Sequence, residues 1–348
     1  MIYYFILLLL VCTFSVLINL KIDLLSKKIS IYDKPDKKRK LHKSKTPILG
    51  WLHTLIAMIF LLLFSFIDNE NIVFKSNIFE IYNEEHIRAF ISLFIGAFLI
   101  FFIGVYDDKN NISATKKSLY LVGILYLIVN FDKTLIINNI YFKDFNYIIY
   151  LENFAIPFTI LSIFFLINSL NLYDGINLQT GLFLTFVFLT FILKGIFVEF
   201  FIVFLISNIL FILKNFNGRL FYGDSGIYLN SYIISYFIIK SYNSINILNT
   251  ELIMIIFFLP ALDLLRVFIV RLLFLKNPFE GDRNHIHHIL VYLFNNINLK
   301  VNLVLLLLFS SPYIFYEFLD ISFIFSFLPA LIFYFSLVIY FYRYKKRI

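Results

Sequence analysis

Two adjacent carboxylates, Asp107 and Asp108, end a long apolar run in this chain of 348 residues. Neighbouring carboxylates repel each other, so one of them can retain its proton or both can share a divalent cation. A solvated helix end with a turn at Asp-Asp-Lys-Asn-Asn would explain the same residues without any chemistry. The pair is therefore a candidate metal or proton site, and other polar groups are needed to decide.

A second polar group spaces Asn168, Asn171 and Asp174 three residues apart. On a helix these side chains share one face, and Gly175 then allows the helix to end or another segment to approach closely. Such a face is costly at a membrane boundary unless it meets a ligand, a metal or another polar surface. Hydrogen bonding between helices is the alternative that needs no ligand.

A third group places Asp224 and Ser225 between Gly223 and Gly226, just before another apolar run. The glycines would let backbone N–H groups and the carboxylate approach a phosphate or its metal ion. Phe221, three residues before Asp224, is able to stack on a flat ring. A plain turn explains the Gly-x-x-Gly spacing equally well, so this motif is weak by itself.

A fourth group contains three of the six histidines, His285, His287 and His288, beside Arg283. A structural zinc site would be incomplete here, because no cysteine is near and a fourth ligand is missing. Binding of an anion or a sugar by histidine and arginine fits the composition better. A solvated polar loop is the alternative without function.

A fifth group is the basic segment 21–46, which carries ten Lys and Arg residues. Arg39, Lys40 and His42 lie in its most basic part, followed by Pro47-Ile-Leu-Gly50. The charges alone could be only a topology signal. The embedded prolines and histidine favour a shaped loop, and both interpretations stay open.

The elements that must position these groups are apolar helices. Of the residues 61% are apolar and 15% are charged, against about 25% charged in soluble domains. Open sheet cannot cross hydrocarbon, the alternation of a membrane barrel is absent, and a single cysteine, Cys12, excludes a disulfide scaffold. The sequence predicts one all-α domain, 1–348, with about 11 transmembrane helices. The runs are 2–20, 47–67, 89–106, 118–131, 154–167, 178–193, 196–213, 227–239, 252–275, 301–318 and 321–342.

Charge predicts the orientation of these helices. The segment 21–46 and the last six residues are basic, whereas the loop 68–88 is mainly acidic. By the positive-inside rule the N-terminus is outside and the C-terminus is cytoplasmic. The loops 21–46, 107–117, 168–177, 214–226 and 276–300 then share the cytoplasmic face. The net charge of +8 requires no nucleic acid, because basic residues also attract anionic lipid.

Together the groups predict phosphate chemistry at the cytoplasmic membrane surface. Mg²⁺ prefers one or two carboxylates together with substrate phosphates. A nucleotide diphosphate is the natural soluble substrate, and a phosphate-headed lipid is the natural partner at the interface. Phosphoryl transfer between them needs mainly positioning and charge neutralisation.

The five groups, taken in their order along the chain, resemble the motifs of the polyprenyl-phosphate N-acetylhexosamine-1-phosphate transferases of glycosyltransferase family 4. The resemblance covers residues 33–290 and is closest to the undecaprenyl-phosphate GlcNAc-1-phosphate branch. It implies that a polyprenyl phosphate oxygen attacks the β-phosphorus of a UDP-N-acetylhexosamine such as UDP-GlcNAc, releasing UMP. The product would start a lipid-linked envelope polysaccharide, such as O-antigen or a cell-wall polymer, at the bacterial inner membrane. Mg²⁺ or Mn²⁺ and a homodimer are also expected.

The resemblance also implies roles for single residues. Asp107, Asp108 and Asp224 would bind the metal and, with Asp174, form the catalytic set. Substrate-binding residues would be Arg39, Lys40, His42, Asn168, Asn171, Phe221, Arg283, His285, His287 and His288. Phe221 would stack on uracil, and the aspartate pair would assist deprotonation of the lipid phosphate.

The chain departs from the family pattern in three places. Asn177 and Leu178 replace an Asp-Gly pair, Trp51 replaces a glycine, and the basic loop has an extra lysine. Two alternatives remain. The phospho-MurNAc-pentapeptide translocase reaction is disfavoured because Ile286 interrupts the histidines. A transporter or flippase of lipid-linked sugars would place its polar residues near mid-span, whereas here they lie at the cytoplasmic ends of the spans. Asp263 and Arg266 lie within a run, but their i, i+3 spacing indicates an ion pair within one helix near its cytoplasmic end.

Overall fold

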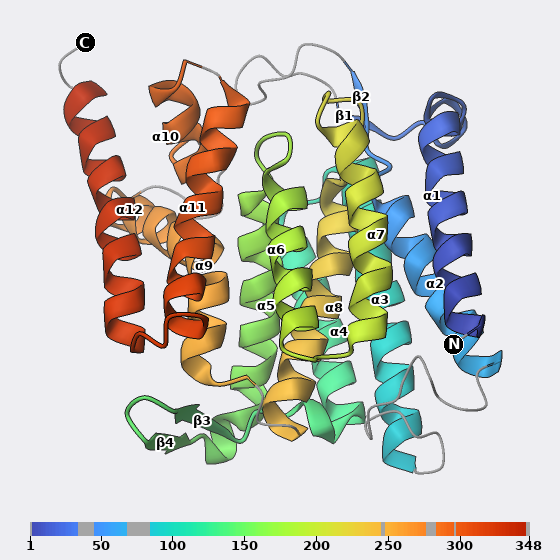
Figure 1. The fold of residues 1–348 in the computed structure, drawn as a ribbon, viewed down its shortest axis with the longest axis horizontal. Coiled ribbons are helices and arrows are strands. Elements are labelled where there is room, and N and C mark those ends of the chain that lie inside the picture. Colours follow the sequence, from blue (N-terminus) through green and yellow to red (C-terminus); the bar gives the residue numbers. More distant parts are fainter. Residues whose placement is uncertain are drawn as a thin grey trace.

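The computed structural model describes residues 2–33, 45–67, 84–244, 248–275, 283–295 and 297–345. They form an all-α bundle whose long helices run roughly side by side (Figure 1). The long helices are α1 (Ile2–Ile29), α2 (Trp51–Ile67), α3 (Glu84–Asn110), α4 (Ala114–Phe131), α5 (Ala155–Tyr173), α6 (Gln179–Leu193), α7 (Val198–Asn215), α8 (Gly223–Ser244), α9 (Thr250–Leu273), α11 (Asn298–Glu317) and α12 (Phe323–Lys345). A short helix, α10 (Ile286–Leu293), precedes α11.

Each predicted apolar run coincides with one of these long helices, so the all-α prediction is confirmed. Among the described residues, 7 helices are long and apolar enough to cross a membrane: α1, α3, α5, α7, α9, α11 and α12. Helices α2 and α6 are apolar but shorter. The helical nature of the eleven runs is thus confirmed, whereas the full count of eleven crossings stays a prediction.

Helix α8 explains why its apolar run looked interrupted in the sequence. It lies in the middle of the bundle and packs against α2, α3 and α5. Almost every side chain from Ser225 to Ser241 is buried, including Asn230 and Ser235. Other helices enclose α8, so these side chains form hydrogen bonds with neighbouring protein groups: Asn230 with Thr54, and Ser235 with the Ser231 carbonyl. A span enclosed by other helices can therefore carry polar residues that a lipid-facing helix cannot.

Phenylalanine rings pack the end of α6, the beginning of α7 and the end of α8 against one another. Phe188 and Phe191 on α6 contact Phe201 on α7, which in turn meets Phe237 on α8 at a centroid distance of 5.1 Å. Tilted and edge-to-face ring pairs add to the free energy of burial. This packing fixes the helix whose first turn carries Asp224.

Two small antiparallel sheets lie outside the long helices. The pair β1 (Tyr32–Asp33) and β2 (Thr46–Pro47) brackets the basic loop. The hairpin of β3 (Asn139–Phe142) and β4 (Tyr147–Tyr150) connects α4 to α5 and was not predicted. Its strands are short and lie between apolar runs, and its turn uses Asn146 at φ 46° without the usual Asn-Gly signal. Short 3-10 turns at Lys133–Leu135 and Glu152–Phe154 flank it.

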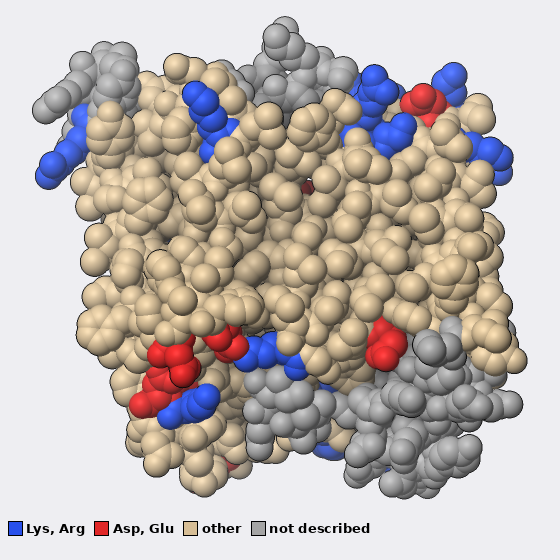
Figure 2. All heavy atoms as spheres, viewed as in Figure 1, with Lys and Arg blue, Asp and Glu red and all other residues tan. Residues whose placement is uncertain are grey.

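The bundle has two chemically different ends. We call the end with β1, β2 and α10 the site end and the opposite end, with β3 and β4, the hairpin end (Figure 1). The chain starts at the hairpin end and finishes at the site end, as an odd number of crossings requires. In Figure 2 a broad uncharged band separates the site end, where Lys and Arg dominate, from the hairpin end, where Asp and Glu are mixed with Lys and Arg.

Candidate active site

Asp108 joins the end of α3 to the beginning of α8. Its Oδ1 accepts a hydrogen bond from the Asp224 backbone N–H at 2.8 Å, and its Oδ2 accepts from the N–H and hydroxyl of Ser225 at 3.1 and 2.6 Å. A carboxylate in this position satisfies the free N–H groups of the helix and complements its dipole. Asp108 therefore caps α8 from another helix and fixes the position of Asp224.

The segment before α8 is held by the segment before α2. Phe221 donates its N–H to the Pro47 carbonyl at 3.0 Å and accepts from the Gly50 N–H at 2.8 Å. Gly223 follows with φ +71°, a left-handed conformation that favours glycine. The half-buried Phe221 side chain is thus carried by a fixed backbone, and its stacking on uracil stays a prediction.

Asp107 and Asp224 face each other across the ammonium group of Lys117. Lys117 Nζ pairs with Asp107 Oδ2 and lies 3.0 Å from Asp224 Oδ2. Asp107 Oδ1 also accepts from the Ile112 N–H at 2.9 Å, which orients the carboxylate. Lys117 was not among the predicted site residues. One signal in the sequence could have indicated it. Lys117 lies in the first turn of α4, shortly after the Asp-Asp pair, and the short connection between α3 and α4 brings that turn back to Asp107.

The donors present fit a divalent cation held by two carboxylates. Asp107 and Asp224 already enclose one positive charge, that of Lys117, and Mg²⁺ takes one or two carboxylates and completes its shell with water and phosphate. Among the described residues no group of three or more His, Cys, Asp or Glu side chains forms a complete protein cage. Both oxygens of Asp108 are occupied by α8, so a role for Asp108 as a direct ligand stays a prediction.

The polar face predicted on residues 168–174 is present at the end of α5. Asn168 donates to the Phe164 carbonyl of its own helix at 2.8 Å, while the Asn171 amide approaches the Asp224 carboxylate. The helix ends at Tyr173, and Asp174 occupies the C-cap, where its Oδ1 accepts from Thr180 Oγ1 at 2.6 Å. Asn171 and Asp174 therefore border the same space as the aspartate–lysine cluster.

Asp174 is exposed to solvent, and its carboxyl lies near the carboxylates of Asp224 and Asp33. Loss of hydration from the enclosing protein, and then the negative charges of Asp224 and Asp33, raise the pKa of Asp174 to about 6. The hydrogen bond from Thr180 opposes this rise. A carboxyl whose pKa is raised beside other carboxylates is a candidate for a functional site, and a cation is the expected ligand there.

The histidine group folds against the Asp174 loop. A Cβ atom on Gly175 would collide with the His287 ring, so only glycine allows this contact. The rings of His285 and His287 are parallel at 5.8 Å, and His288 lies 4.2 Å from His287. Burial, and then the neighbouring His288 and His285, hold the pKa of His287 well below its ordinary value. Its neutral imidazole lies beside Asp174.

The structure places the other predicted residues as follows. Arg283 is exposed beside the histidines, and Arg39, Lys40 and His42 lie outside the described residues. The predicted ion pair within α9 is confirmed, because Arg266 Nη2 lies 2.7 Å from Asp263 Oδ1.

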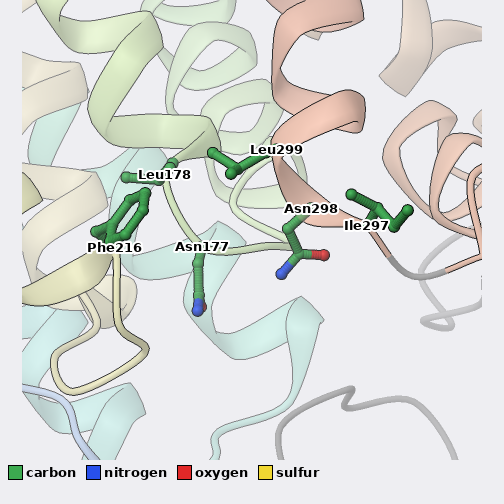
Figure 3. A pocket seen from close by; sticks show the side chains of 6 residues that line it. All are labelled: Asn177, Leu178, Phe216, Ile297, Asn298 and Leu299. Atoms are coloured by element: carbon green, nitrogen blue, oxygen red, sulfur yellow. The ribbon is translucent and has the colours of Figure 1, made fainter.

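A cavity of about 270 Å³ opens beside the Asp174 loop (Figure 3). It is lined by Asn177, Leu178, Phe216, Ile297, Asn298 and Leu299. Two of its lining side chains, Asn177 and Asn298, are amides, and the other four are apolar. Asn302 holds the Asn177 carbonyl at 2.9 Å. The departure from the family motif at Asn177 thus removes a charge from the rim of this cavity.

Comparison with known proteins agrees with this geometry. The model of glycosyl transferase family 4 matches residues 90–242, which include Asp107, Asp174 and Asp224. This part of the chain is therefore similar to glycosyl transferase family 4. The chain is 28% identical over 270 residues to a Bacillus subtilis protein named probable undecaprenyl-phosphate N-acetylglucosaminyl 1-phosphate transferase. That match covers 75% of this chain and 70% of the relative.

Proposed function

We propose that this membrane protein transfers a sugar-1-phosphate from a UDP-N-acetylhexosamine to polyprenyl phosphate, releasing UMP. UDP-GlcNAc is the expected donor and undecaprenyl phosphate the expected acceptor, as in the name of the bacterial relative. The observation that carries the proposal is the meeting of Asp107, Lys117 and Asp224 at one end of an apolar bundle. The similarity of residues 90–242 to glycosyl transferase family 4 supports a phospho-sugar transferase reaction.

The lipid phosphate would be received at the aspartate–lysine cluster. Lys117 can attract its charge, and Asp107 can take its remaining proton. The freed phosphate oxygen then attacks the β-phosphorus of the UDP-sugar, the bond from that phosphorus to the bridging oxygen breaks, and UMP leaves with the electron pair. Asp108 contributes by holding the first turn of α8, and so Asp224, opposite Asp107.

Mg²⁺ is the expected cation, with Mn²⁺ as a substitute, and Asp107 and Asp224 would hold it. When bound, the cation neutralises the diphosphate charge and the charge that develops on UMP. The surrounding residues would position the nucleotide. Asn171 and Asp174 border the cation site, Phe221 offers an aromatic ring, and the stacked histidines close the other side.

The proposal places the site end on the cytoplasmic side of a bacterial inner membrane. The dominance of Lys and Arg at this end supports that orientation (Figure 2). It is tested by Arg283→Cys and Tyr147→Cys, made separately in a Cys12→Ser background, because both positions are exposed and Cys12 is the single cysteine. An impermeant thiol reagent should label Tyr147→Cys in intact cells and Arg283→Cys only after the membrane is opened. The reverse pattern would overturn the orientation.

The reaction is tested by UMP release from purified protein in detergent with polyprenyl phosphate, Mg²⁺ and a panel of UDP-N-acetylhexosamines. Release that needs both the lipid and the cation supports the proposal, and the best donor identifies the sugar. No release from folded protein with any donor would contradict it and favour a lipid-linked sugar flippase. A homodimer, the target polymer and the roles of Arg39, Lys40 and His42 stay predictions.

A further inference from the structure

Asp263 is the centre of a buried hydrogen-bond network that the proposed mechanism does not use. Its Oδ2 lies 2.8 Å from His285 Nδ1. Its Oδ1 accepts from Arg266 Nη2 at 2.7 Å, from the Tyr334 hydroxyl at 2.7 Å and from the Ile286 N–H at 3.0 Å. The side chain is only 2% exposed. A buried carboxylate with this many donors has a single well-defined orientation.

The network joins three parts of the chain that are distant in sequence. Asp263 and Arg266 belong to α9, His285 precedes α10, and Tyr334 belongs to α12. Arg266 also donates to the Asn284 carbonyl at 2.5 Å and, through Nε, to the Tyr334 hydroxyl at 2.6 Å. The backbone before His285 and its ring are therefore held by the same side chains.

The side of His285 away from Asp263 is not satisfied. His285 Nε2 and His287 Nδ1 are buried and have no hydrogen-bond partner among the described residues. Unpartnered buried polar atoms are rare and costly, and these two belong to parallel rings beside the Asp174 loop. Both oxygens of the Asp263 carboxylate thus accept hydrogen bonds, whereas one ring nitrogen of His285 and one of His287 have no partner among the described residues.

We propose that Asp263, supported by Arg266 and Tyr334, is a positioning residue that fixes the tautomer and ring plane of His285 for binding the sugar. The carboxylate accepts from Nδ1–H, so the unprotonated Nε2 is left to accept a hydrogen bond from a hydroxyl or amide group of the sugar. Helix α12 thereby contributes to the site, because its Tyr334 donates a hydrogen bond to Asp263. This inference rests on the proposed transferase function.

The first test is Asp263→Asn. The amide can present N–H to His285 Nδ1 and so favour the wrong tautomer. We expect kcat for UMP release to fall about 10- to 100-fold with little change in KM for the UDP-sugar. Asp263→Glu, which keeps the carboxylate, should recover part of the loss. Wild-type kcat in folded Asp263→Asn would overturn the inference.

Because Asp263→Asn leaves Arg266 without its anion and could prevent folding, Tyr334→Phe provides a milder second variant. It removes one hydroxyl and should lower kcat with unchanged KM. Tyr316→Phe is the matched control, since the Tyr316 hydroxyl also donates to an aspartate, Asp144 at 3.1 Å, and accepts from the Asn249 amide. It lies at the hairpin end, so it should leave kcat unchanged. Equal kcat in Tyr334→Phe and Tyr316→Phe would contradict the inference.

Nitrogen-15 NMR of histidine-labelled protein gives a readout that does not depend on activity. The wild type should show His285 with a protonated Nδ1 and an unprotonated Nε2, identified by the loss of its signals in His285→Gln. Asp263→Asn should change this pattern, and Tyr316→Phe should not. An unchanged pattern in Asp263→Asn would overturn the positioning role even if the wild type released no UMP, whereas failure of the wild-type assay alone would overturn the proposed function.

Discussion

The two ends of α8 carry similar residues with opposite consequences. At the hairpin end Lys240 pairs with Asp132 at 3.1 Å, and Ser92 donates to the same carboxylate at 2.6 Å. The Lys240 and Asp132 side chains are 3% and 1% exposed. One lysine faces one aspartate, so this pair is neutral, buried and fully hydrogen-bonded.

At the site end, Lys117 faces two carboxylates, those of Asp107 and Asp224. With both carboxylates ionised this cluster carries one excess negative charge, and its Lys117 and Asp224 side chains are 21% and 29% exposed. A saturated neutral pair stabilises the fold, whereas a charged cluster open to solvent is suited to a cation and a phosphate. The difference in charge balance and exposure, rather than the residue types, distinguishes the site from a structural contact.

The largest effect is expected from Asp224→Asn. Loss of this carboxylate removes half of the cation site, and UMP release should fall at least about 10²- to 10³-fold, the scale for losing one electrostatic contact in a transition state. The melting temperature should stay near that of the wild type, because the excess charge is relieved. Asp108→Asn should lower turnover similarly by loosening the first turn of α8. Near wild-type turnover in Asp224→Asn would refute the assignment of the Asp107–Lys117–Asp224 cluster as the reactive end of the bundle.

The opposite result is expected from Lys240→Met at the other end of the same helix. Asp132 would be left as an uncompensated buried charge, which costs about 3–5 kcal/mol. The unfolding midpoint of the purified protein should fall, while UMP release per folded molecule should not change. Lower turnover at full stability would mean that the hairpin end also serves the reaction.

A smaller effect is expected from Lys117→Met, which removes the cation between Asp107 and Asp224. Mg²⁺ should then bind the substrate-free protein more tightly, because it no longer competes with the ammonium group. Thermal unfolding with and without Mg²⁺ measures this, since a ligand that binds only the folded state raises its stability. A Mg²⁺-induced shift no larger than that of the wild type would argue against metal binding between these carboxylates.

The smallest effect is expected from Asp174→Asn and depends on pH. The folded pKa of Asp174, about 6, lies above the usual aspartate value of about 3.9. Ionisation of Asp174 therefore lowers the free energy of unfolding. This loss is absent below about pH 4, grows up to about pH 6 and is constant above that. The melting temperature of Asp174→Asn minus that of the wild type should rise across this window. A difference that is flat in pH would show that the enclosing protein does not desolvate the carboxyl.

The sequence predicted the helices well and the contacts between their polar residues poorly. Apolar runs and the positions of Asp107, Asp174 and Asp224 are local features of the chain. The sequence did not indicate that Lys117 bridges two aspartates, that Asp108 caps α8, or that Tyr334 supports His285. It also missed the β3–β4 hairpin, whose strands have no strong turn signal.

The physical reason lies in the range of the interactions. Within a bilayer each backbone N–H and C=O must be satisfied inside its own helix, so composition alone determined an all-α membrane protein and the residue types available for chemistry. Only the tertiary structure decided which of them meet. Lys117 and Asp224 are 107 residues apart, Asp108 and Ser225 are 117 apart, and Asp263 and Tyr334 are 71 apart. Those pairs form because helices distant in sequence pack side by side, and that packing depends on the shapes of many buried side chains at once.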